Sequence, residues 1–242
     1  MRGVPTGPGL VRRVALAVPL LVAACLCGPA PRSLATTGCA PGGTAAPPGA
    51  AERKVSDLDW DGQPDTLWVG QFRDDSGRTA RVVGITTASG ANSDVQVLSA
   101  SPIPLTALAI DAQQDGQHQV IVSDGRGAHL YVFADCRLQT VSDNQGAPFL
   151  FDLQDLRGNG TGIGCGNLGP PMPGRHLIGL RAAAQDGQWT VRRTEIDLNG
   201  ALATIGQSDT LAATSAQDPA VVSAQTISCG DLTISKDGVR QP

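Results

Sequence analysis

The nine residues Asp57-Leu58-Asp59-Trp60-Asp61-Gly62-Gln63-Pro64-Asp65 place four carboxylates at positions one, three, five and nine. Four negative charges this close repel one another, and a cation between them removes that cost. Ca²⁺ takes about six to eight oxygen ligands, which a tight loop can supply. Glycine at position six allows the left-handed backbone of such a loop. The stretch therefore predicts one Ca²⁺ site, whose ligands are the side chains of Asp57, Asp59, Asp61 and Asp65 and the carbonyl group of Gln63.

The EF-hand shares the first half of this pattern but requires a glutamate at loop position twelve. That position is Trp68 here, and no helical pattern flanks the loop. The apolar run 66–69 follows at once and is typical of a strand. These departures exclude an EF-hand. The remaining alternative to a metal site is an acidic, solvated β-turn.

The same pattern recurs in weaker form at residues 111–119, which also run into an apolar segment. An offset of 54 residues aligns Asp111 with Asp57, Asp115 with Asp61 and Gly116 with Gly62, whereas Gln113 and Gln119 stand where the other two acids would be. A third, fainter copy spans residues 167–176, with prolines in place of acids. Only the first loop retains enough charged oxygen for Ca²⁺, so we expect one metal and two structural turns.

Asp-x-Asp-x-Asp-Gly-x-x-Asp followed by an apolar strand resembles the calcium loop of FG-GAP or VCBS repeats, known from integrin alpha chains. The resemblance covers most of residues 55–182. It implies that each loop joins two strands of a propeller blade, and that a propeller face binds a protein or glycan ligand.

Short apolar runs separated by turns predict an all-β fold. The 30 glycines and 17 prolines among 242 residues also favour a turn-rich β protein. Hairpin turns are expected at Asp124-Gly125, Asp186-Gly187 and Asn199-Gly200. The predicted strands span residues 66–72, 80–86, 94–98, 119–123, 128–133, 176–181 and 189–198.

Three recognisable repeats predict a small or incomplete β-propeller, with a β-sandwich as the alternative. A fourth blade would come from residues 189–205 together with a strand near 227–235. Weak helical patterns at residues 104–110 and 209–216 predict a turn or two of helix.

The N-terminus has the pattern of an export leader, residues 1–24, with three arginines before an apolar run. The run ends in Val-Ala-Ala-Cys25, which resembles a bacterial lipobox and predicts lipidation of Cys25. The alternative is ordinary cleavage after Ala35, which would release a secreted protein. Residues 25–53, rich in Pro, Gly and Ala, predict a tether, and residues 54–242 an all-β repeat domain.

Four further cysteines are disulfide candidates in an oxidising compartment: Cys39, Cys136, Cys165 and Cys229. Pairing cannot be derived from sequence alone. The short separation favours Cys136 with Cys165, which leaves Cys39 with Cys229. Cys27, beside the anchor, is expected to remain free.

Motifs for other chemistry are weak. Basic clusters are absent outside the leader, which argues against nucleic acid as a partner. Residues 158–164 are glycine-rich but lack the spacing of a nucleotide-binding loop, and a flexible turn that approaches another backbone is expected. The acids Asp152 and Asp155 are a weak candidate pair for acid–base catalysis.

Two functions follow. The first is a non-enzymatic binding protein with one structural Ca²⁺, held by a lipid anchor at the outer face of the cytoplasmic membrane. The second is an extracytoplasmic hydrolase or polysaccharide lyase on the same scaffold. The enzyme hypothesis predicts a pocket that gathers several members of one group: Asp152, Asp155, Arg157, His129 and His176.

Overall fold

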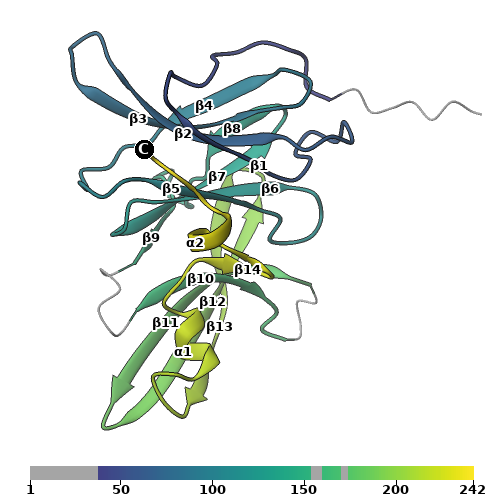
Figure 1. Ribbon diagram of the computed structural model, residues 1–242. Helices are drawn as coiled ribbons and strands as arrows, with labels where there is room; N and C mark the ends of the chain where they lie inside the picture. The colour runs from purple at the N-terminus through teal and green to yellow at the C-terminus, as the bar shows by residue number, and fades with distance from the viewer. Residues whose placement is uncertain (1–37, 154–159, 170–173) are drawn as a thin grey trace, which may run out of the picture. The chain divides into compact units, whose positions relative to one another are not determined.

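The computed structural model describes residues 38–153, 160–169 and 174–242, and the architecture is all-β (Figure 1). These residues belong to one unit, residues 35–242. The predicted leader, Cys25 and Cys27, together with Asp155 and Arg157, lie outside the described residues. Within the described ranges, no helix is long and apolar enough to cross a membrane.

Three antiparallel sheets follow one another along the chain, and none of them is closed in the described part. The first sheet has the order β1 (Ala51–Lys54), β2 (Thr66–Arg73), β3 (Thr79–Thr86), β4 (Asn92–Gln96). The central sheet has the order β16 (Val239–Arg240), β5 (Thr106–Ile110), β6 (His118–Ser123), β7 (Gly127–Ala134), β8 (Arg137–Thr140), and β9 (Leu150–Asp152) also pairs with β7.

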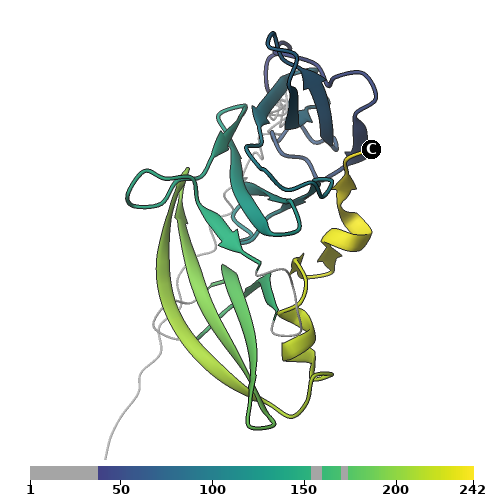
Figure 2. The same ribbon diagram turned by 90° about the vertical axis from the view of Figure 1, so that its left-hand side faces the viewer.

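The third sheet has the order β10 (Thr161–Gly166), β11 (His176–Gln185), β12 (Gln188–Asn199), β13 (Leu202–Ala213). Its long β12–β13 hairpin is visible in Figure 2. The chain then forms helix α1 (Pro219–Ser223), a short ribbon of β14 (Ser228–Cys229) and β15 (Leu232–Thr233), and helix α2 (Ile234–Asp237). The predicted fourth blade is therefore wrong: residues 189–205 belong to the β12–β13 hairpin of the third sheet, and residues 227–235 contain the separate β14–β15 ribbon.

The central sheet is buried on both faces, which explains its nearly continuous apolar sequence. In β6, Val120 and Val122 belong to a core shared with the first sheet, whereas Ile121 between them belongs to a core shared with the third. Side chains alternate across a strand, so one apolar run supplies both cores. Full burial of each such side chain stabilises the fold by about 1.5–3 kcal/mol.

The segment before β1 packs on the first sheet, although it was predicted as part of a tether. Gly42 forms a parallel bridge with Ala91, and Pro47 lies where a side chain at Gly70 would be. Cys39 is only 4% exposed. The packed domain therefore begins ahead of residue 54, because small residues can lie close against a strand that carries glycine.

Two disulfides involve the four candidate cysteines, but the predicted pairing is wrong. Cys39 pairs with Cys136 in the β7–β8 turn, and Cys165 in β10 pairs with Cys229 in β14. Their Cα–Cα distances are 5.5 Å and 4.9 Å. Short sequence separation misled the prediction, because the partners are set by which segments lie side by side: Ile163 in β10 bridges Ile227 just before β14.

All seven predicted strands exist, and the three predicted turns join β6–β7, β11–β12 and β12–β13. The two predicted helical segments are wrong, since Thr106–Ile110 forms β5 and strand β13 runs to Ala213. The flexible turn predicted for residues 158–164 is wrong for the part that the structure describes, which forms strand β10 from Thr161 onward. As expected, it approaches another backbone: a Cβ at Gly162 would lie 2.5 Å from the carbonyl oxygen of Thr226.

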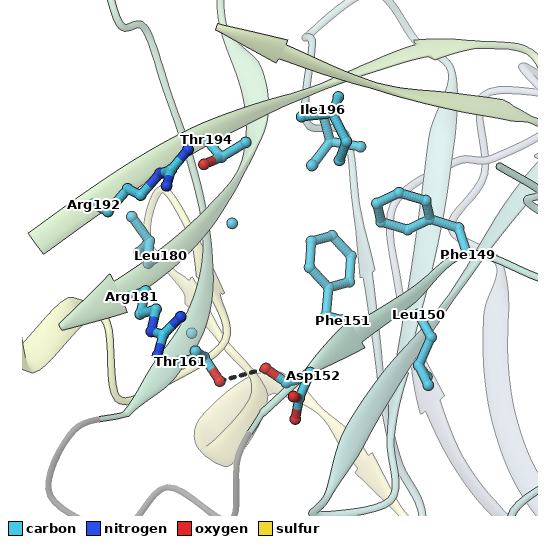
Figure 3. A pocket seen from close by; sticks show the side chains of 13 residues that line it. Phe149, Leu150, Phe151, Asp152, Thr161, Leu180, Arg181, Arg192, Thr194 and Ile196 are labelled. Carbon is cyan, nitrogen blue, oxygen red and sulfur yellow. Dashed lines mark hydrogen bonds between the residues drawn. The ribbon is translucent and has the colours of Figure 1, made fainter. Parts of the chain in front are cut away.

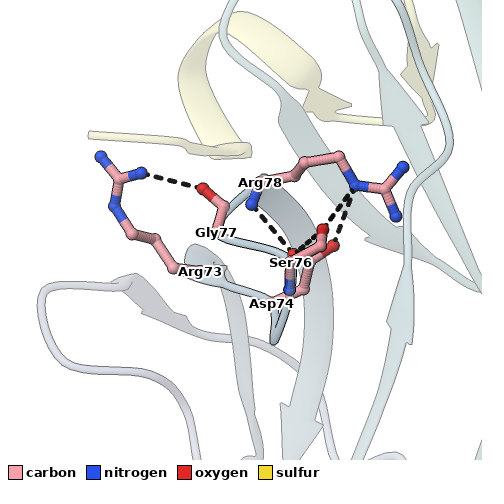
Figure 4. A network of polar contacts seen from close by, with 5 residues as sticks. All are labelled: Arg73, Asp74, Ser76, Gly77 and Arg78. Carbon is pink, nitrogen blue, oxygen red and sulfur yellow. Dashed lines mark hydrogen bonds and ion pairs between the residues drawn. The ribbon is translucent and has the colours of Figure 1, made fainter.

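The β2–β3 turn has its own polar network, which is shown in Figure 4. The Asp74 carboxylate accepts hydrogen bonds from the backbone N–H groups of Ser76 and Arg78, both at 2.9 Å. The Ser76 hydroxyl, the largest contributor, and these N–H groups hold the pKa of Asp74 below its ordinary value. The carboxylate therefore organises the turn in its ionised form.

Candidate metal centre

The three acids at positions one, three and five of the first loop converge. Asp57, Asp59 and Asp61 lie in the connection between β1 and β2 and are partly buried. Each offers a carboxylate oxygen, and these oxygens all lie within 4.8 Å of one another. Calcium–oxygen distances are about 2.3–2.6 Å, so two oxygens on opposite sides of one ion would lie about 4.6–5.2 Å apart, close to the 4.8 Å within which these oxygens lie. The cluster could therefore hold a metal ion.

Backbone N–H groups orient the three carboxylates. Asp57 accepts from the N–H groups of Trp60 and Gly62, both at 2.7 Å, and Asp61 accepts from Gln63 at 2.7 Å. Gly62 has φ of +85°. The loop is thus folded around its own acids, because each carboxylate satisfies an N–H that would otherwise need water.

Asp59 is oriented by two residues from outside the loop. The N–H of Cys39 donates to its Oδ2 at 2.7 Å, and the hydroxyl of Ser89 donates to the same oxygen at 3.3 Å. These partners lie 20 and 30 residues away in sequence. No local sequence pattern could have predicted that Cys39 and Ser89 contact Asp59. Cys39, whose N–H lies next to the cluster, is also held by a disulfide.

Asp65, the fourth predicted ligand, does not belong to the group. It is fully buried, and its two carboxylate oxygens accept from the N–H groups of Leu58 at 2.7 Å and Ala88 at 2.8 Å. Burial raises the pKa of Asp65 above its ordinary value, and repulsion from Asp59 and Asp57 adds to this effect against the two hydrogen bonds. Asp65 therefore closes the loop and ties it to the β3–β4 turn. Gln63, the predicted carbonyl ligand, is exposed and donates its N–H to Asp61.

The second loop, residues 111–119, leads from β5 into β6 and repeats three of the hydrogen bonds of the first. Gly116 N–H donates to Asp111 at 3.1 Å, and Gln117 N–H donates to Asp115 at 2.9 Å. The buried Gln119 accepts from the N–H of Ala112 at 2.9 Å, as Asp65 accepts from Leu58. Each bond has its counterpart 54 residues earlier.

The predicted third loop joins β10 to β11, and residues 170–173 within it lie outside the described part. Its first residue, Asn167, accepts from the N–H of Gly169 at 2.6 Å. The N–H of Leu168 donates to Glu195 on β12 at 3.3 Å, and Glu195 is only 1% exposed. In this loop the acceptor for the N–H at position two is thus a carboxylate on a neighbouring strand, whereas in the other two loops it is the side chain at position nine, Asp65 or Gln119.

The two loops with the best-matched sequences also touch. The ring of Trp60 lies against Gly116, where an added Cβ would be 1.8 Å from the ring. A cavity of about 330 Å³ is lined by both loops and by the Cys39–Cys136 disulfide. The first loop is therefore braced by the second loop and by the disulfide from Cys39 to the β7–β8 turn.

The residues of the enzyme hypothesis are not gathered in the described part of the chain. Asp152 lines a pocket on the third sheet (Figure 3), whereas neither His129 nor His176 lines it. The ring of His129 stacks on that of Tyr131. Burial lowers the pKa of His129; the charge of Asp124 opposes this shift and that of Arg81 adds to it. His176 begins β11 as His118 begins β6, and both are buried, so the two histidines share a repeated structural position.

Comparison with known proteins adds no identity. No family model, no curated protein and no solved structure matches this chain.

Proposed function

We propose that this chain is a calcium-stabilised binding protein that works outside the cytoplasm. The observation that carries the proposal is the convergence of Asp57, Asp59 and Asp61 within 4.8 Å. All the donors are carboxylate oxygens, the hard ligands that Ca²⁺ prefers. Calcium neutralises the repulsion among the three acids and Asp65, and so locks the β1–β2 connection.

The repeated loop geometry supports membership of the FG-GAP/VCBS type. Each of the three sheets contains four successive antiparallel strands, and in each the candidate loop joins the first strand to the second. We propose that these are three blade-like repeats of a small or incomplete propeller, and that only the first binds calcium. Stacked sheets with shared cores are also compatible with a sandwich.

The two disulfides and the leader pattern support an oxidising compartment. We propose that Cys25 is lipidated and anchors the protein at the outer face of the cytoplasmic membrane, where a site of weak affinity would be filled by calcium. The partner is then a protein or glycan of the envelope. Release as a secreted protein is the alternative that cleavage after Ala35 would produce.

Thermal unfolding of residues 35–242 with Ca²⁺ and with a chelator tests the metal. At a Ca²⁺ concentration 100 times Kd, binding adds about 2.7 kcal/mol of stability, or roughly 5–10 °C in Tm for a domain of this size. Asp59→Ala and the milder Asp61→Asn should remove this increase. Identical melting curves with Ca²⁺ and with chelator would contradict the proposal.

The second loop provides a matched control. Gln113 occupies the position of Asp59, so Gln113→Ala should leave the calcium response intact. Tb³⁺ offers a direct readout, because Trp60 lies within the loop and can sensitise its luminescence on excitation. Trp60→Phe should weaken the luminescence but keep the Ca²⁺-induced rise in Tm, which separates ion binding from the reporter.

A further inference from the structure

A pocket of about 320 Å³ lies on one face of the third sheet, away from the metal loop in sequence and in lining residues. Phe149, just before β9, and Phe151, within β9, form one wall, and their ring centroids lie 5.1 Å apart in an edge-to-face arrangement. Arg181 from β11 and Arg192 from β12 lie on the other side (Figure 3). An aromatic wall thus faces a pair of arginines, and the acid Asp152 also lines the pocket.

The two arginines form a cross-strand pair. Arg181 and Arg192 are directly opposite in the β11–β12 register, and both are exposed. Like charges at such positions destabilise a sheet. In the described part of the chain neither guanidinium makes an ion pair, whereas the adjacent Arg193 is paired with Asp209. A negative ligand would relieve the repulsion that the fold leaves in place at this pocket.

Gly179 keeps the middle of the pocket open. It lies in the interior of β11, where glycine weakens a strand and often marks the close approach of a ligand. A Cβ built there would meet the Phe151 ring at 3.8 Å, which is ordinary contact, so no steric clash requires glycine. Any larger side chain at this position would instead occupy the space between Phe151 and the arginines.

We propose that this pocket binds a small ring-bearing anion, whose carboxylate or phosphate pairs with Arg181 and Arg192 while its ring lies against Phe151. Guanidinium groups recognise both anions through charge-assisted hydrogen bonds. The volume falls within the usual range for small-molecule sites, about 300–1,000 Å³. The inference rests on the proposed binding function and specifies its ligand class.

Calorimetric titration of the protein with both disulfides formed tests the site. The two probes are methyl β-D-glucuronide and phenyl phosphate, which separate a sugar acid from an aromatic anion. Methyl β-D-glucoside and phenol are their neutral counterparts. Saturable binding of either anion, and at least about tenfold weaker binding of its neutral counterpart, is expected, since hydrogen bonds to charged groups are worth that factor. Binding of neither anion, or equal binding of the neutral compound, overturns the proposal.

Three variants locate the binding. Arg181→Gln with Arg192→Gln should weaken anion binding at least about tenfold, and Gly179→Val should abolish it by filling the pocket while Tm is maintained. Arg137→Gln removes an exposed arginine from β8 and should change nothing. Equal loss in Arg137→Gln would indicate nonspecific charge attraction and overturn the site. Asp61→Asn, which breaks the metal loop, should leave anion binding unchanged, so failure of the calcium proposal is distinguishable.

Discussion

The first and second loops have the same backbone path but different charge. Both turn at a glycine with φ near +85°, Gly62 at +85° and Gly116 at +83°. Both are closed by a buried side chain at position nine, Asp65 or Gln119. This side chain accepts a hydrogen bond from the backbone N–H at position two of the same loop. The first loop carries four acids and the second only two.

The difference teaches that the loop fold does not depend on the full set of acids. A neutral amide at position nine makes the same closing hydrogen bond as a carboxylate, so this position serves the backbone. What separates the loops is position three, where Asp59 completes the carboxylate group and Gln113 does not. Position nine therefore serves the fold of the loop and position three the candidate metal site, and substitutions at these two positions test the division.

The largest effect is expected from removing the closing side chain. Asp65→Ala should cost about 3 kcal/mol of unfolding free energy, because it leaves the buried N–H group of Leu58 and the partly buried N–H group of Ala88 without their acceptors. Gln119→Ala should cost about 2 kcal/mol, because the buried N–H group of Ala112 loses its hydrogen-bond acceptor. Urea unfolding in the presence of chelator measures both values without a metal contribution.

Asp115→Ala is the control for these two variants. Asp115 is exposed and accepts only from the N–H of Gln117 in the described structure, so its loss should cost about 0.5–1 kcal/mol. If Asp65→Ala were no more destabilising than Asp115→Ala, position nine would not be the closing residue, and the division between folding and metal binding would fail.

Much of the fold could be predicted because local sequence and burial agree. The apolar run of β6 and the Asp-Gly and Asn-Gly turns identify strands and hairpins from adjacent residues alone. The 54-residue offset identified the second loop. The Arg181–Arg192 pair was also within reach, because the turn at Asp186-Gly187 places these two arginines at equal distances from its centre.

Other features depend on contacts that sequence does not encode locally. The Leu- and Ala-rich segment of β5 has helical propensity, but burial on both faces of the central sheet overrides it. The disulfide partners are set by the packing of β10 on β14 and of the first segment on the β7–β8 turn. Asp65 resembled a ligand because an acid in a pattern looks the same whether it faces an ion or two N–H groups.

A smaller effect should distinguish the two glycines. Gly62→Ala and Gly116→Ala impose the same strain at positive φ, about 1 kcal/mol. Nothing lies within 4 Å of a Cβ at Gly62, whereas Trp60 would clash with one at Gly116. Gly116→Ala should therefore cost about 2 kcal/mol, and combination with Trp60→Ala should remove the excess. Equal losses, with no coupling to Trp60, would show that the loops do not brace each other.

The smallest expected effect concerns the turns that follow the loops, where Asp74 and Asp124 organise the β2–β3 and β6–β7 hairpins. Burial by itself would raise the pKa of Asp124, but hydrogen bonds from Ser99 and from two backbone N–H groups outweigh it and hold the pKa below its ordinary value. A lowered native pKa stabilises the fold above the unfolded value, about 3.9, and this contribution is lost as pH falls through the native pKa.

Asp124→Asn should therefore cost about 1 kcal/mol at pH 7, and the difference from wild type should shrink as the pH falls below about 4. Asp74→Asn should change stability less, because its carboxylate is solvent-exposed and water replaces the lost hydrogen bonds. Urea midpoints at pH 7 and pH 3 measure both differences. A stability difference between Asp124→Asn and wild type that stays constant with pH would mean that the packing of Asp124, and not its charge, stabilises the β6–β7 hairpin. The β6–β7 and β2–β3 hairpins would then be stabilised in different ways.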